Sequence, residues 1–191
     1  MIDNATFDEL EPKIPAQRDT VYTAWREALS TLSDEPATLR EALPTPADSR
    51  RMRDIQVACA PITPLMLRDN AAAIAANHVL IADIAGIPVG FVLASISEKH
   101  SPLFVQVVAV VSEAQRRGIG LQLLSAAAEL EPHRDIALAT QKTNLAAHAM
   151  DKRFAESIGA SIHRVNLGVY PDKLLGIPRG QGYRVWGIKR G

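Results

Sequence analysis

The sequence has one cysteine, no excess charge of either sign and no long hydrophobic run, and each absence excludes a class of protein. Cys59 is the single cysteine among 191 residues, so an intrachain disulfide and a disulfide-stabilised secreted scaffold are excluded. It stands in the apolar stretch Val57-Ala58-Cys59-Ala60, which is typical of a buried, unreactive thiol. We therefore expect a cytoplasmic protein.

Positive and negative side chains are balanced, with 21 Lys and Arg against 21 Asp and Glu. The chain lacks the positive excess that draws proteins to nucleic acid, so we expect no nucleic-acid partner. The one basic cluster, Arg50, Arg51 and Arg53, is typical of a solvated helix face rather than a ligand site.

No apolar run approaches the roughly 20 residues of a membrane-spanning helix, and the acidic start Met1-Ile2-Asp3-Asn4 is unlike a signal peptide. We therefore expect no membrane association. The histidines show no metal-ligand spacing, so no metal is expected either. The length favours a single domain over residues 1–191.

The apolar patterns predict an α/β sandwich around a mixed sheet. Helices are expected over 20–32, 37–43, 65–76, 121–131 and 144–158. Strands are expected over 78–85, 89–97, 103–111, 136–140, 162–169 and 183–189. The first two strands form a hairpin through the turn Gly86-Ile87-Pro88, and the nearly continuous apolar run 103–111 is typical of a central strand.

The helix expected over 144–158 should bury one side and end at Gly159. Its buried side is predicted to contain Leu145, Ala149, Met150, Phe154 and Ile158.

The most informative segment links the central strand to the next helix and contains Gly118 and Gly120. A helix that opens after such a loop leaves backbone N–H groups unpaired, and its dipole adds partial positive charge there. This place suits a phosphate or pyrophosphate, which can approach closely because glycine has no Cβ. The alternative is an ordinary strand-to-helix turn with surface arginines.

Two common nucleotide-binding motifs do not fit this segment. A Walker A loop requires Lys and then Ser or Thr after its last glycine, where this chain has Leu121 and Gln122. A dinucleotide fingerprint requires a third glycine, where this chain has Leu123.

The hexapeptide Gln115-Arg116-Arg117-Gly118-Ile119-Gly120 instead resembles the signature of the GNAT superfamily of acyl-CoA-dependent N-acyltransferases. The hairpin around Pro88-Val89-Gly90-Phe91-Val92 and the segment from Asn144 to Gly159 are similar to other elements of that family. The resemblance implies a mixed, mostly antiparallel central sheet with helices on both faces. It also implies an acyl-CoA-binding core over 78–165, with an N-terminal arm and helices on the acceptor side over 1–60.

The resemblance further implies how acetyl-CoA, the acyl donor, is bound. Backbone amides of Arg116 to Leu121 would cradle the pyrophosphate, and the backbone of Val108 to Val110 would pair with pantetheine like an added strand. The implied coenzyme-binding residues are Val108, Ala109, Val110, Gln115, Arg116, Arg117, Gly118, Ile119, Gly120, Leu121 and Asn144. For Asn144, a helix N-cap is an equally good interpretation.

Acetyl transfer to an amine requires a neutral nucleophile, stabilisation of an oxyanion and a proton for the departing thiolate. The resemblance gives the oxyanion contact to the backbone N–H of Val110. Many relatives place a tyrosine on the later helix, where this chain has Ala155 or, in another register, Asp151. They also place a carboxylate on the central strand, where Gln106 is the only polar residue.

The general base is therefore unassigned, with Glu98 and His100 as candidates after the third strand. Ser157 or a water could protonate the thiolate, which could also leave directly. Tyr22, Trp25, Tyr183 and Trp186 could line the acceptor pocket, with core packing as the alternative.

The sequence thus predicts an N-acetyltransferase that moves an acetyl group from acetyl-CoA to a primary amine by direct attack in a ternary complex. The alternatives are a non-catalytic acyl-CoA-binding regulatory module and a transferase for a longer acyl chain. The acceptor is unspecified, although the loop 171–182 should help to select it. The oligomeric state, a homodimer included, is also open.

Overall fold

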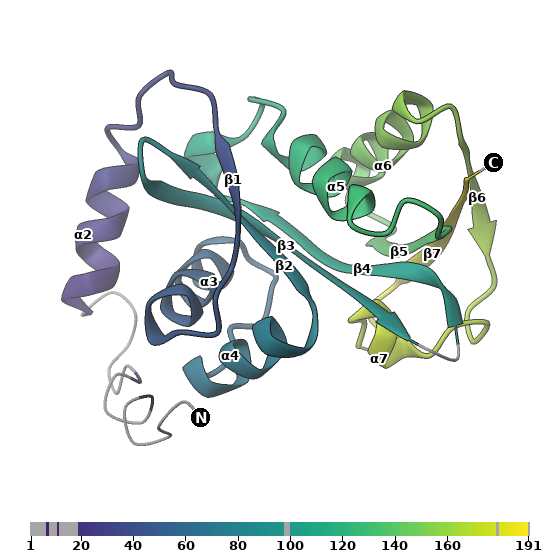
Figure 1. Ribbon diagram of the computed structural model, residues 1–191, viewed down its shortest axis with the longest axis horizontal. Helices are drawn as coiled ribbons and strands as arrows, with labels where there is room; N and C mark the ends of the chain where they lie inside the picture. The colour runs from purple at the N-terminus through teal and green to yellow at the C-terminus, as the bar shows by residue number, and fades with distance from the viewer. Residues whose placement is uncertain (1–6, 8–10, 12–18, 98–99, 179, 191) are drawn as a thin grey trace. The chain divides into compact units, whose positions relative to one another are not determined.

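The computed structural model describes residues 7, 11, 19–97, 100–178 and 180–190. Within these described residues, seven strands form a sheet in the order β1-β2-β3-β4-β5-β7-β6 (Figure 1). Strand β1 pairs antiparallel with β2, and β7 pairs antiparallel with both β5 and β6, whereas β4 and β5 are parallel. The predicted α/β fold around a mixed, mostly antiparallel sheet is confirmed.

The chain divides into two compact units. The first contains Met1–Phe91 and Ala109–Ile119, and the second contains Val92–Val108 and Gly120–Gly191. The arrangement expected from the sequence, one domain with an acceptor side over 1–60 and a core over 78–165, stays a prediction.

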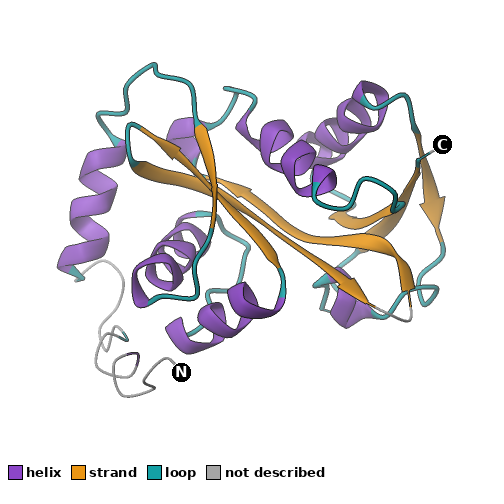
Figure 2. Ribbon diagram, in the orientation of Figure 1, coloured by secondary structure: helices purple, strands orange, loops and turns teal. Residues whose placement is uncertain are grey.

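The first unit is built from α2 (Thr20–Leu29), β1 (Thr38–Glu41), α3 (Pro46–Ala58), α4 (Leu67–Ala76) and β2 (His78–Ile84). It also holds the start of β3 (Ile87–Ser97), the end of β4 (His100–Val110) and the short helix η2 (Ser112–Ala114). Helices α3 and α4 lie side by side (Figure 2). Their fully buried side chains include Met52, Ile55 and Leu67.

The second unit adds α5 (Ile119–Glu129), β5 (Ile136–Gln141), α6 (Leu145–Ser157), β6 (Ser161–Val165), α7 (Asp172–Leu175) and β7 (Tyr183–Lys189). Figure 1 shows α5 and α6 on one side of these strands and α7 on the other. Strand β5 is buried from both sides, because Ala137 packs against Leu175 of α7 and Thr140 bonds Asp151 of α6.

The turn between β2 and β3 is shorter than the sequence suggested. Ala85 and Gly86 have φ of 49° and 78°, the positive values that a two-residue type I′ hairpin turn requires. Ile87 and Pro88, expected in the turn, already belong to β3. The predicted hairpin is otherwise present, with its two strands adjacent in the sheet.

The helix predicted over 37–43 is wrong, because this segment forms β1. Thr38 to Glu41 pair with Asp83 to Leu80 of β2. An isolated helix of seven residues is marginal in water, whereas pairing with β2 satisfies the same backbone groups. Arg40 then reaches Asp48 and Asp83, at 2.8 Å each.

Helix α3 was not predicted, because polar side chains fill much of its buried face. Its buried residues include Asp48, Ser49, Asp54 and Gln56, so the apolar spacing of an amphipathic helix is interrupted. The helix begins conventionally, with Thr45 as N-cap and Pro46 in the first turn.

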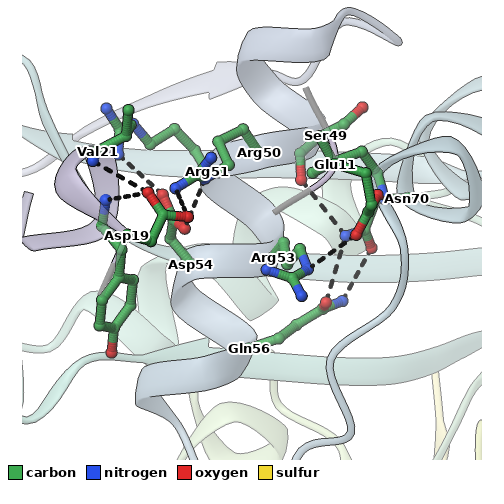
Figure 3. Close-up of polar contacts among 12 residues, drawn as sticks. Glu11, Asp19, Val21, Ser49, Arg50, Arg51, Arg53, Asp54, Gln56 and Asn70 are labelled. Atoms are coloured by element: carbon green, nitrogen blue, oxygen red, sulfur yellow. Dashed lines mark hydrogen bonds and ion pairs between the residues drawn. The ribbon is translucent and has the colours of Figure 1, made fainter. Parts of the chain in front are cut away.

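The basic cluster of α3 is held in ion pairs rather than in a solvated face (Figure 3). The pairs are Arg50 with Asp19 and Asp54, Arg51 with Asp54, and Arg53 with Glu11. Burial acts to raise the pKa of Asp19. The ion pair with Arg50 and the backbone N–H groups of α2 that Asp19 caps outweigh burial, so the pKa of Asp19 is lowered. The cluster therefore stabilises the packing of α3 and the start of α2.

The buried side of α6 differs from the predicted one. Phe154 is buried as expected, but Leu145 is 74% exposed, and Ala149 and Ile158 are exposed too. Asp151 and Ala155 are buried instead. The helix ends as predicted, with Gly159 at a φ of 67° just beyond it.

Candidate functional site

The loop between β4 and α5 contains two residues with positive φ. Arg116 has a φ of 66° and Gly118 a φ of 78°, and glycine adopts this conformation without strain. Helix α5 follows at once and is anchored by buried Ile119, Leu123 and Leu124. The predicted strand, glycine loop and helix are therefore present in this order.

This loop is open at its surface. Residues 115–118 are exposed, and Gln115 braces the loop because its Nε2 donates a hydrogen bond to the carbonyl of Val110 at 3.1 Å. The first N–H groups of an α-helix have no partner within the helix, and the helix dipole favours an anion there. The start of α5 is thus suited to bind a phosphate group.

The loop is also tied to α2 and the residues that follow it. Arg26 lies 2.6 Å from Glu113, and Arg117 Nη1 donates to the carbonyl of Ser33 at 2.6 Å. Burial acts to raise the pKa of Glu113, but hydrogen bonds from its own N–H and Ser112 together with Arg26 lower it. Glu113 is therefore an ionised brace. These contacts join segments that are distant in the chain, and no sequence pattern indicates them.

Strand β4 leaves β5 partway along its length. The parallel pairing covers Leu103–Val105 with Ile136–Leu138, although β4 continues to Val110 and β5 to Gln141. In these described stretches, residues 106–108 of β4 therefore have no ladder with β5. Gln106 does not serve as a free polar group, because its Nε2 donates to Ser95 Oγ at 3.0 Å.

Strands β3 and β4 approach closely near the end of β4. A Cβ on Gly90 would lie 2.6 Å from the carbonyl oxygen of Ala109 and 3.4 Å from the Cα of Val110. Gly90 thereby fixes the backbone of two residues predicted to contact the coenzyme.

The other candidate residues lie in several different elements. Val110 ends β4, His100 is its first residue, and Glu98 lies outside the described residues. Asn144 caps α6, because its Oδ1 accepts from the N–H of Ala147 at 3.0 Å. Ser157 Oγ donates to the carbonyl of Phe154 at 2.7 Å, so its proton is engaged within α6.

Asp151 is a buried acid on α6. Its side chain accepts a hydrogen bond from Thr140 Oγ1 of β5 at 2.8 Å, and the residue is 4% exposed. Burial raises the pKa of Asp151 to about 6, against the opposing effect of Thr140. The sequence pointed to this position only as one of two that align with a tyrosine of relatives.

The aromatic residues proposed for an acceptor pocket make packing contacts. Trp25 is buried, and its Nε1 donates a hydrogen bond to the carbonyl of Pro88 at 2.9 Å. The ring centroids of Tyr22 and Trp25 are 5.6 Å apart. Trp186 stacks on His148 of α6 at 4.2 Å. Trp25 also lines the recess of the first unit, so the lining of an acceptor pocket by these aromatic residues stays a prediction.

The first unit has a recess of about 940 Å³ lined by α2, the start of α3 and the β2–β3 turn. Its charged lining residues are Arg40, Asp48, Arg50 and Arg51, and all take part in the ion pairs described above. The charged side chains that line the recess are therefore already paired within the protein.

Two other predictions concern Cys59 and metals. Cys59 is half-buried at the end of α3, and burial raises its pKa to about 11, so the thiol stays protonated at neutral pH. In the part of the chain that the structure describes, no three His, Cys, Asp or Glu side chains gather to hold a metal ion. No described helix is long and apolar enough to cross a membrane.

The fold is a mixed α/β fold in which the central strand β4 leads, through the glycine loop, into a helix start that is suited to an anion. The chain belongs to the acetyltransferase (GNAT) family, whose model matches residues 46–155. It is accordingly an acyltransferase. Comparison with curated proteins gives no match.

Several solved structures share the fold. Diaminobutyrate acetyltransferase from Paenibacillus lautus, in complex with L-2,4-diaminobutyric acid and coenzyme A, is 20% identical with a TM-score of 0.66 over 80% of this chain and 93% of that one. Naa50 of Arabidopsis thaliana, bound to the bisubstrate analogue CoA-Ac-MVNAL, is 18% identical with a TM-score of 0.58 over 80% of this chain and 98% of that one. The ribosomal-protein-S18-alanine N-acetyltransferase of Escherichia coli is 18% identical with a TM-score of 0.57 over 79% of this chain and 92% of that one.

Proposed function

We propose that this protein is an N-acetyltransferase that transfers the acetyl group of acetyl-CoA to a primary amine by direct attack in a ternary complex. The observation that carries the proposal is the exposed loop from Gln115 to Gly118, which opens directly into α5 after the central strand. Family membership supports acetyl transfer in general.

In this proposal the start of α5 holds the pyrophosphate. Backbone amides from Arg116 to Leu121 supply the donors, and Gln115 holds the loop through its bond to Val110. The pantetheine chain runs beside residues 108–110 of β4, whose N–H groups pair with its amides as a neighbouring strand would.

The same strand also supplies the hydrogen bond that stabilises the oxyanion. The N–H of Val110 donates to the thioester carbonyl, where negative charge develops during attack. Glu98 and His100 stay candidate bases for removing the proton of the amine. Asn144 caps α6, and this role is compatible with a contact to the coenzyme.

The acceptor class follows from the relatives as a proposal. They are described as acting on a diamino acid or a protein alanine, or as binding a peptide analogue, so small amines and peptide N-termini are the first acceptors to test. We further propose that the enzyme acts in the cytoplasm and needs no metal.

Turnover is the direct test of this function. Purified protein is incubated with acetyl-CoA and, separately, L-2,4-diaminobutyrate, an N-terminal alanine peptide and the peptide Met-Val-Asn-Ala-Leu, and thiol release is followed. We expect amine-dependent release with at least one acceptor, unchanged by a chelator. Coenzyme binding without release with any amine would favour the non-catalytic regulatory module, and faster release from longer acyl-CoAs would favour the long-chain transferase.

A further inference from the structure

The segment that leads into α5 holds a conformation that its own backbone does not favour. We call residues 112–118 the coenzyme loop. Arg116 has a φ of 66°, in the left-handed region that is unfavourable for a residue with a Cβ. Gly118 also has a positive φ, but glycine adopts it without strain. A strained residue keeps such a conformation only when surrounding contacts hold it, so the contacts of this loop are informative.

Three side-chain contacts hold the coenzyme loop, and two of them come from α2 and the residues after it. Arg26 of α2 lies 2.6 Å from Glu113. Arg117 Nη1 donates a hydrogen bond to the carbonyl oxygen of Ser33 at 2.6 Å. The third contact is the hydrogen bond from Gln115 back to the end of β4. These contacts lie on both sides of the strained residue, so together they can fix its conformation.

Helix α2 is itself well anchored within the same compact unit. Trp25 and Leu29 are buried, and Trp25 Nε1 donates to the carbonyl of Pro88 near the start of β3. The next carbonyl, that of Val89, accepts a hydrogen bond from the N–H of Val111, just before the coenzyme loop. All these residues belong to the first unit. The helix is therefore a fixed support against which the loop is held.

The two arginines of the coenzyme loop have different surroundings. The guanidinium of Arg117 points toward the segment after α2, where it bonds Ser33 and lies 3.9 Å from Asp34. Arg116 makes no hydrogen bond or ion pair with another residue in the part of the chain that the structure describes. The side chain of Arg116 is thus available to a phosphate, whereas that of Arg117 is engaged in holding the loop.

We propose that α2 is a clamp for the coenzyme loop, and that Arg26, Glu113 and Arg117 are positioning residues for the pyrophosphate of acetyl-CoA. This inference rests on the proposed function and adds a control of the same site by a helix that is distant in the chain. The apparent affinity for a ligand falls with the fraction of protein in the binding conformation. An unclamped loop that holds this conformation about one tenth of the time would therefore bind about 10-fold more weakly.

The first experiment measures the affinity for acetyl-CoA by calorimetry in Arg26→Gln, Glu113→Gln and the double variant. Glu27→Gln, at an exposed position of α2, is the control. We expect each single variant to bind about 10-fold more weakly, and the double variant no more weakly than either, because all three break the same contact. The KM for acetyl-CoA should rise with kcat unchanged. The control should match the wild type.

The sign of the change in Glu113→Gln separates positioning from a simple effect of charge. If the two side chains acted through their charges alone, loss of the negative charge of Glu113 would strengthen binding of the polyanionic coenzyme, and loss of Arg26 would weaken it. Tighter or unchanged binding in Glu113→Gln would overturn the clamp. A wild type that does not bind acetyl-CoA would instead overturn the proposed function.

A second measurement needs neither coenzyme nor turnover. The N–H groups of Ala114 and Gln115 donate hydrogen bonds within this segment, so their hydrogen exchange reports whether the loop is held. We expect exchange about 10-fold faster in Glu113→Gln and in Arg117→Gln, and unchanged in Arg116→Gln, which breaks no described contact. Exchange rates equal to those of the wild type in the first two variants would overturn the clamp, even where the wild type binds the coenzyme.

Discussion

At the scale of single residues, Asp151 carries an energetic cost that depends on pH. Burial raises its pKa from an ordinary value of 3.8 to about 6. The protonated form bears no penalty, so the cost is absent below the ordinary value. It grows as the pH rises and is complete above about 6, where it amounts to about 3 kcal/mol of folding free energy.

Asp151→Asn should therefore stabilise the protein at neutral pH. We expect a melting temperature higher by about 6–12 °C at pH 8, because the buried charge is removed while the bond from Thr140 is kept. The difference should vanish near pH 4. Thermal melts of both proteins across this range measure it, with Glu156→Gln as control. A variant less stable than the wild type at pH 8 would show that the carboxylate is stabilising where it stands.

At the scale of elements, the contact between β3 and β4 sets the geometry of the proposed site. A methyl group on Gly90 would meet the carbonyl oxygen of Ala109, so Gly90→Ala must push β4 away from β3. We expect a loss of about 1–3 kcal/mol in stability and about 100-fold in turnover, because the N–H of Val110 is displaced. Denaturant unfolding and acetyl-transfer kinetics measure the two effects.

Gly86→Ala is the matched control for this change. Gly86 lies in the β2–β3 turn with a φ of 78°, and nothing lies within 4 Å of a Cβ built there. The variant should lose stability through backbone strain alone and keep its turnover. Equal loss of turnover in both variants would mean that the effect comes from general destabilisation.

Elements with dense apolar patterns could be predicted from the sequence. Strand β4 contains a nearly continuous apolar run, and α5 follows the glycine loop with regular apolar spacing. The pattern fails where polar groups are buried, as in α3, whose Asp48 and Asp54 are compensated by arginines. It also fails for β1, where four residues gain their structure from β2.

The candidate site, too, could be predicted from the sequence only in part. The glycine loop could be found because its six residues are contiguous and its chemistry lies in the backbone. Contacts such as Arg26 with Glu113, or Thr140 with Asp151, join segments whose proximity only the fold creates. For this reason the sequence could favour an acyl-CoA site but could not assign the group that moves the proton.

At the scale of the whole molecule, the chain has no net charge, while the proposed coenzyme is a polyanion. Long-range attraction therefore contributes little to binding. Affinity must come from local donors at the start of α5 and from contacts along β4. Binding should consequently be sensitive to a single charge placed in the loop.

The most direct measurement is calorimetric titration with acetyl-CoA of the wild type, Gly120→Glu and Gln122→Glu. Glutamate is favourable in the first turn of a helix, so both variants should fold. Gln122 is exposed in the same turn, and its variant carries the same added charge. We predict clear binding of acetyl-CoA to the wild type and to Gln122→Glu. The affinity of Gly120→Glu should be lower by about 100-fold or more, because its carboxylate would occupy the place of the pyrophosphate. Equal affinity of all three proteins, or no binding to the wild type at millimolar coenzyme, would contradict the assignment of this loop.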